Sequence, residues 1–215
     1  MTEGVAEQMG LRGRKRLQQR ADLLLTASRL FRSEGYEKTR MEDIAAATNV
    51  SPKTVYNYFP TKSAILFALQ DLAREQVRRE YEKVATNPPA KFEEALVQLC
   101  LAHLGEINGL EDKKLWRELM AAKMRDHEHT SRDFEATRKV YTSYIIDTLY
   151  VYKNRNVLDE TADLKLMAEI VFAMSFYNFR AFCAVDDEDE RLFRRRVRKQ
   201  MRSVGRSWLT LNNNS

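Results

Sequence analysis

The sequence predicts an all-α protein with about nine helices, and three observations favour helices over strands. The chain of 215 residues contains only 7 Gly and 4 Pro, the residues that most often interrupt helices. Apolar residues recur at helical spacing along most of the chain, and capping residues stand at several segment ends. The chain is 44% hydrophobic, which is enough for a sizeable core, and its length fits one or two domains.

The N-terminal region is predicted to hold three helices, preceded by a disordered stretch over residues 1–13. The three helices run over about 16–34, 41–47 and 52–59. Gly35 ends the first helix, because glycine readily takes the left-handed conformation that follows a helix. The turn "TNVS" joins the second helix to the third, and Asn49 is expected there with a positive φ, which asparagine tolerates better than most residues.

The third helix, in the stretch "SPKTVYNYFPTK", is short and carries polar and aromatic side chains. Ser51 suits the N-cap, Pro52 suits the first helical position, and Pro60 ends the helix. A helix of about 10 to 12 Å is not stable alone, so the other helices must hold it. Helical geometry places an apolar set on one side, namely Pro52, Val55 and Phe59. The other side carries Lys53, Thr54, Asn57 and Tyr58, with Tyr56 at the edge.

The rest of the chain is predicted to form six more helices. A fourth helix runs from 62 to about 84, and "ATNPPA" at 85–90 then interrupts the pattern. The remaining five helices are expected over 91–107, 111–125, 132–153 and 161–184, and from the acidic run at 186–190 to about 211. The predicted domains are 14–62, with 62–84 as a connector, and 85–211.

Two helices, a tight turn and a short helix with an outward polar face describe a helix-turn-helix. An ordinary helical hairpin is the alternative. A basic arm with Arg14 and Arg16 lies just upstream, Lys62 lies just beyond, and the net charge of +5 permits a nucleic-acid partner. The major groove of DNA admits a helix, in which lysine pairs with guanine and asparagine with adenine. These features favour DNA binding.

Residues 26–69 resemble the N-terminal domain of tetracycline-repressor (TetR) family regulators. The landmarks are Leu30-Phe31, Gly35-Tyr36, Thr39, Ile44-Ala45, Val50-Ser51, Thr54-Val55-Tyr56, Tyr58-Phe59, Lys62 and Leu66. The chain departs from the family pattern at Asn49, where glycine is usual, and at Arg40, where threonine or serine is usual. The hydroxyl cap of the second helix is therefore lost or shifted to Thr39.

The resemblance implies that Lys53, Thr54, Tyr56 and Tyr58 meet DNA and that Lys62 binds a phosphate. Asn57 is added from its place on the polar face. Arg40 either reaches a phosphate or remains in solvent, and the arm either enters a flanking minor groove or is a solvated tail. The predicted DNA-binding set is Arg14, Arg16, Thr39, Arg40, Ser51, Lys53, Thr54, Tyr56, Asn57, Tyr58 and Lys62.

The resemblance also implies that the remaining residues form a domain for ligand sensing and dimerisation. Residues 164–185 are apolar on nearly every face, so they are expected to be buried on all sides. The final helix carries an apolar stripe, and two such helices from each of two chains would form a four-helix interface. Burial within one monomer is the alternative. The predicted dimer interface is Phe172, Phe179, Phe182, Val197, Met201, Val204 and Trp208.

A ligand pocket is expected among the helices of the second domain. Its candidate lining residues are His103, Trp116, Met120, Tyr144, Phe172, Phe176 and Tyr177. For each of them taken alone, plain core packing is the favoured interpretation, because aromatic residues and methionine at helical spacing usually belong to a core. Such a lining would suit a mainly apolar or aromatic ligand with few polar anchors.

The sequence gives no support for an enzyme, a cofactor or a metal. It contains no Ser/His/Asp set and no phosphate loop, and "DHEH" at 126–129 sits in an expected loop without metal-ligand spacing. Cys100 and Cys183 are interpreted as core residues, with a redox pair as the alternative. No run of about 18 apolar residues and no signal peptide is found, so a cytoplasmic protein is expected.

The last helix carries a run of arginines from Arg191 to Arg206. We interpret this run as a solvated face that forms ion pairs with the acids at 186–190, and a second nucleic-acid site is the alternative. The whole sequence predicts a homodimeric repressor that leaves an inverted-repeat operator when a small molecule binds. The alternatives are an activator or architectural DNA protein without ligand release, and a helical enzyme or lipid carrier. Neither the effector nor the operator follows from the sequence.

Overall fold

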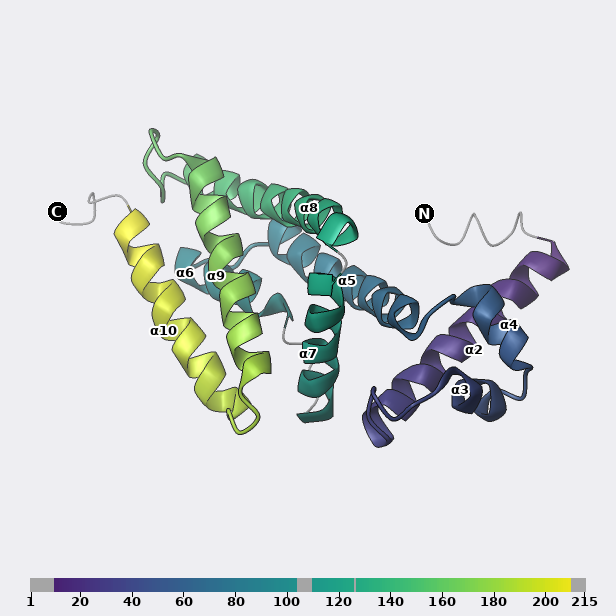
Figure 1. Ribbon diagram of the computed structural model, residues 1–215. Coiled ribbons are helices and arrows are strands. Elements are labelled where there is room, and N and C mark those ends of the chain that lie inside the picture. Colours follow the sequence, from purple (N-terminus) through teal and green to yellow (C-terminus); the bar gives the residue numbers. More distant parts are fainter. Residues whose placement is uncertain (1–9, 104–109, 126, 210–215) are drawn as a thin grey trace. The chain divides into compact units, whose positions relative to one another are not determined.

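The computed structural model describes residues 10–103, 110–125 and 127–209, without the side chains at 110 and 127–132. The described residues contain nine α-helices and no β-strand, which confirms the predicted all-α fold (Figure 1). The helices are α2 Leu11–Ser33, α3 Met41–Ala47, α4 Pro52–Tyr58, α5 Lys62–Thr86, α6 Phe92–Leu101, α7 Leu110–Arg125, α8 His127–Asn154, α9 Leu164–Ala184 and α10 Glu190–Trp208.

The helix ends agree best with the prediction where caps mark them. The helix α3 has the expected bounds and α4 ends at Tyr58, next to its expected end at residue 59, because Pro60 and the turn around Asn49 delimit them. By contrast, α2 begins at Leu11 and absorbs the basic arm, and α8 begins at His127 in the expected loop. Both predictions were wrong, because arginine, lysine and glutamine are good helix formers and extend a helix in the absence of a stop signal. The predicted disorder of residues 1–9 lies outside the described residues.

The chain divides into two compact units, one reaching Leu72 and the other beginning at Ala73. The division falls within α5, so a single helix contributes residues to both units. The domain boundary near residues 85–90 stays a prediction. Each unit has its own buried residues and is described by itself below.

The core of the first unit is built from α2, α3, α4 and the start of α5. The helix α3 contacts both α2 and α4. Phe31 of α2, Ile44 of α3 and Val55 of α4 are almost completely buried. Pro52 is exposed, so its placement on the inner side of α4 was wrong. Val55 and Phe59 are the buried side chains by which this short helix packs on the scaffold.

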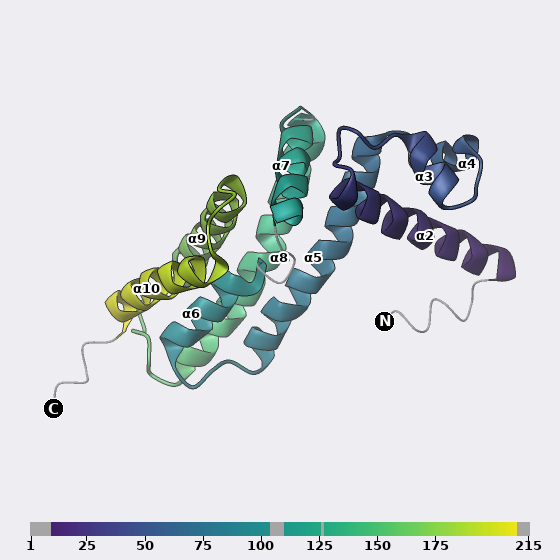
Figure 2. The ribbon, with the colours of Figure 1, turned by 90° about the horizontal axis from the view of Figure 1, so that it is seen from below.

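In the second unit, six of the ten residues of α6 are buried, and this helix lies beside α10 (Figure 2). It packs against α9 and α10, and α9 also contacts α7 and α8. Leu96 and Leu99 are fully buried. Cys100 and Cys183 are also buried and are not joined in a disulfide, which confirms their interpretation as core residues. Burial raises the pKa of Cys100 to about 11, so the reactive thiolate is scarce at neutral pH.

The helix α9 is long and apolar enough to cross a membrane by length and composition, and half of its most apolar window is buried within the chain. It contacts α6, α7 and α8, as a core helix does. The expectation that it is buried on all sides was wrong. Leu166 is 56% exposed and Tyr177 is 69% exposed. One face of α9 is therefore open to solvent.

The helix α10 is strongly amphipathic. Its apolar stripe of Phe193, Val197 and Met201 is buried within the chain, and α10 packs chiefly against α6. On the polar side, Arg194 pairs with Glu190 and Arg196 with Glu188. The expected pairing of the α10 arginines with the acidic run at 186–190 is thus confirmed for Arg194 and Arg196.

Gly205 allows the close approach of α10 to α6. A Cβ atom at this position would lie 2.8 Å from Glu93 Cγ and 3.3 Å from Leu96 Cδ1. We expect Gly205→Leu to lower the free energy of unfolding by about 2 kcal/mol, because the added side chain overpacks this contact. Urea unfolding followed by tryptophan fluorescence measures the change. Ser203→Leu is the control, since Ser203 is an exposed residue of the same helix. An unchanged urea midpoint in Gly205→Leu would contradict the close contact.

Candidate nucleic-acid interface and apolar groove

The helix α4 is held by the features that its sequence predicts. Asn49 has φ 54°, which confirms the expected positive value and closes the turn before the helix. The Oγ of Ser51 accepts a hydrogen bond of 3.2 Å from the backbone N–H of Thr54, which confirms the N-cap, and Pro52 occupies the first turn. The orientation of α4 is thus fixed by its own cap, the turn and two buried side chains.

The outer face of α4 presents donors and an aromatic ring to solvent. Lys53 and Asn57 are exposed, Tyr56 is 45% exposed, and Thr54 and Tyr58 are half-buried. The hydroxyl groups of Thr54 and Ser51 lie 2.9 Å apart. The predicted polar face is therefore brought together on one helix, with cationic, amide and hydroxyl groups in reach of a partner. Whether these residues contact DNA remains a prediction.

Arg14 and Arg16 lie in the first turns of α2 and are exposed. They belong to a regular helix that begins at Leu11, whereas the first helix was predicted to begin at about residue 16. A contact between these two side chains and DNA remains a prediction, but any contact would come from a helix.

Thr39 and Arg40 do not share the same environment. Thr39 is 2% exposed, and its hydroxyl donates to the carbonyl of Gly35 at 2.9 Å. Thr39 therefore holds the turn after α2 and does not cap α3. Arg40 is exposed and takes the N-cap position of α3, where its N–H donates to Asp43 Oδ2 at 2.8 Å. The cap of α3 is supplied by that carboxylate, and the sequence analysis missed Asp43 in this role.

The Lys62 ammonium group is already engaged inside the first unit. Its Nζ donates to the carbonyls of Tyr36, Glu37 and Thr39 at 2.6, 3.1 and 3.1 Å. It also lies 4.3 Å from the centre of the Tyr36 ring. These contacts satisfy the donors of the ammonium group. The phosphate contact predicted for Lys62 would therefore compete with a structural role.

A groove of about 740 Å³ lies in the second unit among α7, α8 and α9. Four of the seven predicted lining residues contribute to it, namely Met120, Phe172, Phe176 and Tyr177. The sequence analysis missed its other lining residues, including Phe134 of α8. It also missed three arginines, one on each helix: Arg117, Arg138 and Arg180. Nothing in their sequence positions indicates that these arginines line a groove, because exposed arginines are common on helices.

The other three predicted lining residues lie elsewhere in the second unit. Tyr144 accepts a hydrogen bond of 3.2 Å from Arg78 of α5. The Trp116 ring packs edge-on against Phe179, with centroids 5.1 Å apart. His103 also packs against Phe179, at 5.5 Å. Their packing within the chain agrees with the alternative of core residues, and their part in ligand binding stays a prediction.

The imidazole of His103 is enclosed by aromatic rings. Its centroid lies 6.0 Å from that of Tyr81 and 5.5 Å from that of Tyr141. Its Nε2 has no hydrogen-bond partner among the residues that the structure describes, and the same is true of Asn178 Oδ1. Burial lowers the pKa of His103 to about 4, so the ring is neutral at pH 7.

The predicted dimer residues lie mostly in the core of a single chain. Phe172, Phe179, Phe182, Val197 and Met201 are at most 7% exposed. Only Val204 and Trp208 are half-buried. The alternative of burial within one monomer thus fits the first five residues, and a contact between two chains would need other exposed side chains. Among the described residues, no group of three or more His, Cys, Asp or Glu residues is arranged to hold a metal ion.

Comparison with known proteins identifies relatives that match part of the chain. Residues 23–69 match the family described as bacterial regulatory proteins, tetR family. The HTH-type transcriptional regulator TcmR of Streptomyces glaucescens is 41% identical over 56 residues, which cover 26% of this chain and 25% of TcmR. The HTH-type transcriptional regulator EthR of Mycobacterium tuberculosis is 32% identical over 94 residues, covering 41% of this chain and 44% of EthR. The chain thus spans less than half the length of these relatives.

Solved structures share the fold over most of the chain. The TetR-family transcriptional regulator PfmR from Thermus thermophilus has a TM-score of 0.61 and 23% identity, covering 86% of this chain and 97% of PfmR. A TetR-family regulator from Pectobacterium atrosepticum has a TM-score of 0.68 and 18% identity, covering 90% of this chain and 95% of that protein. At these identities the similarity extends to the fold alone.

Proposed function

Because this chain belongs to the tetR family of bacterial regulatory proteins, we propose that it is a transcriptional regulator that binds an operator in double-stranded DNA. The observation that carries the proposal is the outer face of α4. There Lys53, Tyr56 and Asn57 are exposed on a short helix whose orientation is fixed by a capped turn. A helix of this size fits the major groove, where lysine and asparagine read base edges and hydroxyl groups contact phosphates.

We further propose that the protein acts in the cytoplasm as a homodimeric repressor and that a small effector releases it from DNA. Dimers suit inverted half-sites, which lie about one helical turn or more apart. The effector would bind in the second unit and act through α5, because this helix contributes to both units. Arg74 and Arg78 of α5 bond to Asp133 and Tyr144 of α8, which lines the groove. Release requires that the effector and DNA favour different states of the protein.

The first test is fluorescence anisotropy of the protein with duplex DNA. The probes are duplexes from the DNA flanking the gene of this protein and shuffled controls, each at low and at physiological salt. We expect selective binding that persists at physiological salt. Equal and salt-sensitive binding to both duplexes would contradict operator recognition and favour an architectural protein, since contacts to phosphates alone carry no sequence information.

We propose that Lys53, an exposed lysine of α4, reads a base. We expect Lys53→Ala to weaken binding to the operator about tenfold and to relax sequence preference at one position of each half-site. Tyr58→Ala should instead weaken binding to all sequences alike. Titration of each variant with a panel of single-base operator variants measures both effects. Arg29→Ala is the control, because it removes an exposed cation of the same unit outside α4. Intact specificity in Lys53→Ala would remove Lys53 from base readout.

A further inference from the structure

The groove in the second unit has an aromatic wall. Phe134 of α8 packs edge-on against Phe176 of α9, with ring centroids 5.6 Å apart. Phe172 and Phe176 are stacked one turn apart at 6.0 Å. Met120 of α7 also lines the groove. A surface of three rings and a thioether is suited to burying the apolar part of a small molecule.

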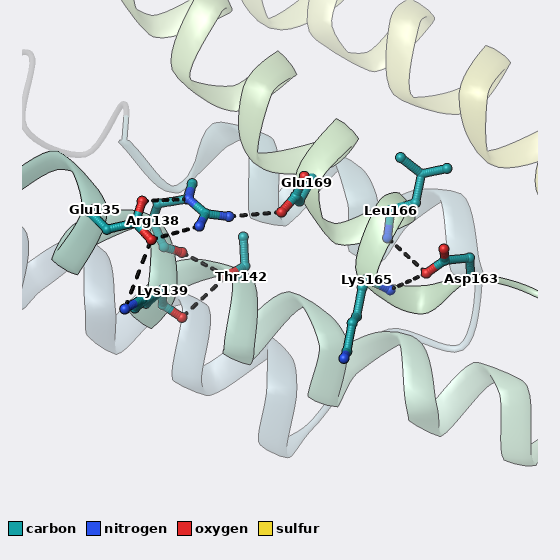
Figure 3. A network of polar contacts seen from close by, with 8 residues as sticks. All are labelled: Glu135, Arg138, Lys139, Thr142, Asp163, Lys165, Leu166 and Glu169. Carbon is teal, nitrogen blue, oxygen red and sulfur yellow. Dashed lines mark hydrogen bonds and ion pairs between the residues drawn. The ribbon is translucent and has the colours of Figure 1, made fainter.

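Two of the three arginines in the groove are already neutralised. Arg117 pairs with Asp186 at 2.7 Å, and its other guanidinium nitrogen donates to the carbonyl of Cys183 at 2.7 Å. Arg138 lies between two carboxylates, those of Glu135 on α8 and Glu169 on α9, at 2.7 and 2.8 Å (Figure 3). These two arginines therefore join elements of the fold.

Arg180 differs from them. Its guanidinium lies 5.5 Å from the centre of the Phe176 ring, at the edge of the aromatic wall. No carboxylate pairs with it among the side chains that the structure describes. The groove thus combines an apolar wall with one cation whose charge is not balanced by a neighbouring acid.

We propose that this groove binds an amphipathic anion, whose carboxylate pairs with Arg180 and whose apolar body lies against Phe134, Phe172 and Phe176. The inference rests on the proposed function in one respect, since it takes this molecule to be the effector. It also refines the expectation of a mainly apolar ligand by naming the polar anchor.

The geometry supports an anion over a neutral molecule. Guanidinium and carboxylate groups form charge-assisted hydrogen bonds in a two-pronged arrangement, and the apolar wall beside Arg180 shields that contact from water on one side. The groove volume of about 740 Å³ falls in the range of small-molecule sites. A cationic ligand would meet Arg180, while Glu169, the acid among the groove residues that the structure describes, is bonded to Arg138.

The test uses three probes with the same tail and different head groups, namely dodecanoate, 1-dodecanol and dodecyltrimethylammonium. Titration calorimetry of the full chain, below the concentration at which each probe forms micelles, gives the affinities. We expect dodecanoate to bind about tenfold more tightly than the alcohol, and the cation to bind most weakly. Equal affinities for the three probes would overturn the assignment of Arg180 as an anchor.

Two variants locate the site. Arg180→Gln should reduce the affinity for dodecanoate about tenfold and leave the affinity for the alcohol unchanged. Ala173→Trp, at an exposed position that lines the groove, should abolish binding of both probes. Arg195→Gln is the matched control, because it removes an exposed arginine of α10 that does not line the groove. Unchanged dodecanoate binding in both groove variants would place the ligand elsewhere and refute the proposal.

Sedimentation and DNA binding separate the inference from its alternatives. If a second copy of the chain occupies the groove, Ala173→Trp will shift the monomer–dimer equilibrium in the absence of any probe, and dodecanoate will not bind to the dimer. That result would overturn the inference. If dodecanoate binds through Arg180 but leaves DNA affinity unchanged, the ligand site is correct and the proposed release mechanism is wrong.

Discussion

We expect Lys62→Met to lower the free energy of unfolding of the first unit by about 2 kcal/mol, because Lys62 has a structural role. Its ammonium group donates to three carbonyls in the turn after α2 and lies over the Tyr36 ring. Methionine keeps much of the length and apolar stem of the side chain but leaves those carbonyls without their charged donor. Removing one partner of a buried or half-buried hydrogen bond to a charged group costs about 1 to 3 kcal/mol.

Hydrogen exchange is the appropriate measurement for Lys62→Met. Both tryptophans lie in the second unit, at positions 116 and 208, so their fluorescence does not report on the first unit. We expect faster exchange of the amides of α2, α3 and α4, and unchanged exchange in α9 and α10. Lys53→Met is the matched control, because Lys53 is an exposed lysine of the same unit that has no described partner.

The same variant separates the two roles of Lys62. If the residue is structural, DNA affinity falls together with the stability of α4 and recovers at lower temperature, where the unit is folded. If Lys62 instead contacts a phosphate, as the family resemblance implies, affinity falls while exchange in the first unit stays as in the wild type. The salt dependence of binding would then also decrease, since one cation fewer releases counterions.

The helix-turn-helix was predictable because its information is local. Ser51, Pro52 and Pro60 delimit α4 by their own backbone preferences, and Asn49 permits the turn before it. Its inner and outer faces follow from helical periodicity alone, apart from Pro52. The engagement of Lys62 was not predictable in this way, since its partners lie more than twenty residues earlier and are backbone carbonyls that any residue carries.

The second unit shows the limit of periodicity more clearly. The apolar stripe of α10 was recognised from the sequence, but its partner was taken to be a second chain. The stripe instead packs within one chain, against α6, where Gly205 permits a close approach that no spacing pattern reveals. A periodic stripe defines which face is buried and leaves open what buries it.

The groove could not be assembled from the sequence for a related reason. Its aromatic residues on α9 were predicted as lining residues, since they lie on consecutive turns of one helix. Arg180 became informative only when its lack of an acidic partner was known, and that depends on the contacts of α7, α8 and α9 together. Pairing of Arg117 and Arg138 with acids from other segments is what distinguishes Arg180 from them.

Acidification provides the second large effect, through the buried imidazole of His103. Burial lowers its pKa from 6.5 to about 4, so the unfolded chain takes up a proton between these values and the folded chain does not. The contribution of His103 to the free energy of unfolding is therefore complete above pH 6.5. It decreases as the pH falls towards 4, where the folded imidazole also becomes protonated. A difference of this size contributes about 3 kcal/mol of free energy of unfolding over that interval.

His103→Leu removes this contribution and also removes from the aromatic enclosure a nitrogen, Nε2, that has no hydrogen-bond partner among the described residues. We therefore expect the variant to be at least as stable as the wild type at pH 7, and its stability to change less between pH 6.5 and 4. Urea unfolding followed by tryptophan fluorescence reports on the second unit, because Trp116 packs against Phe179 beside His103. Carboxylates such as Asp133 titrate in both proteins, so the difference between the two pH profiles isolates the imidazole. His127→Leu is the control for the loss of another histidine. If the stability of the wild type and of His103→Leu depends on pH in the same way, the imidazole of His103 is not buried in its neutral form.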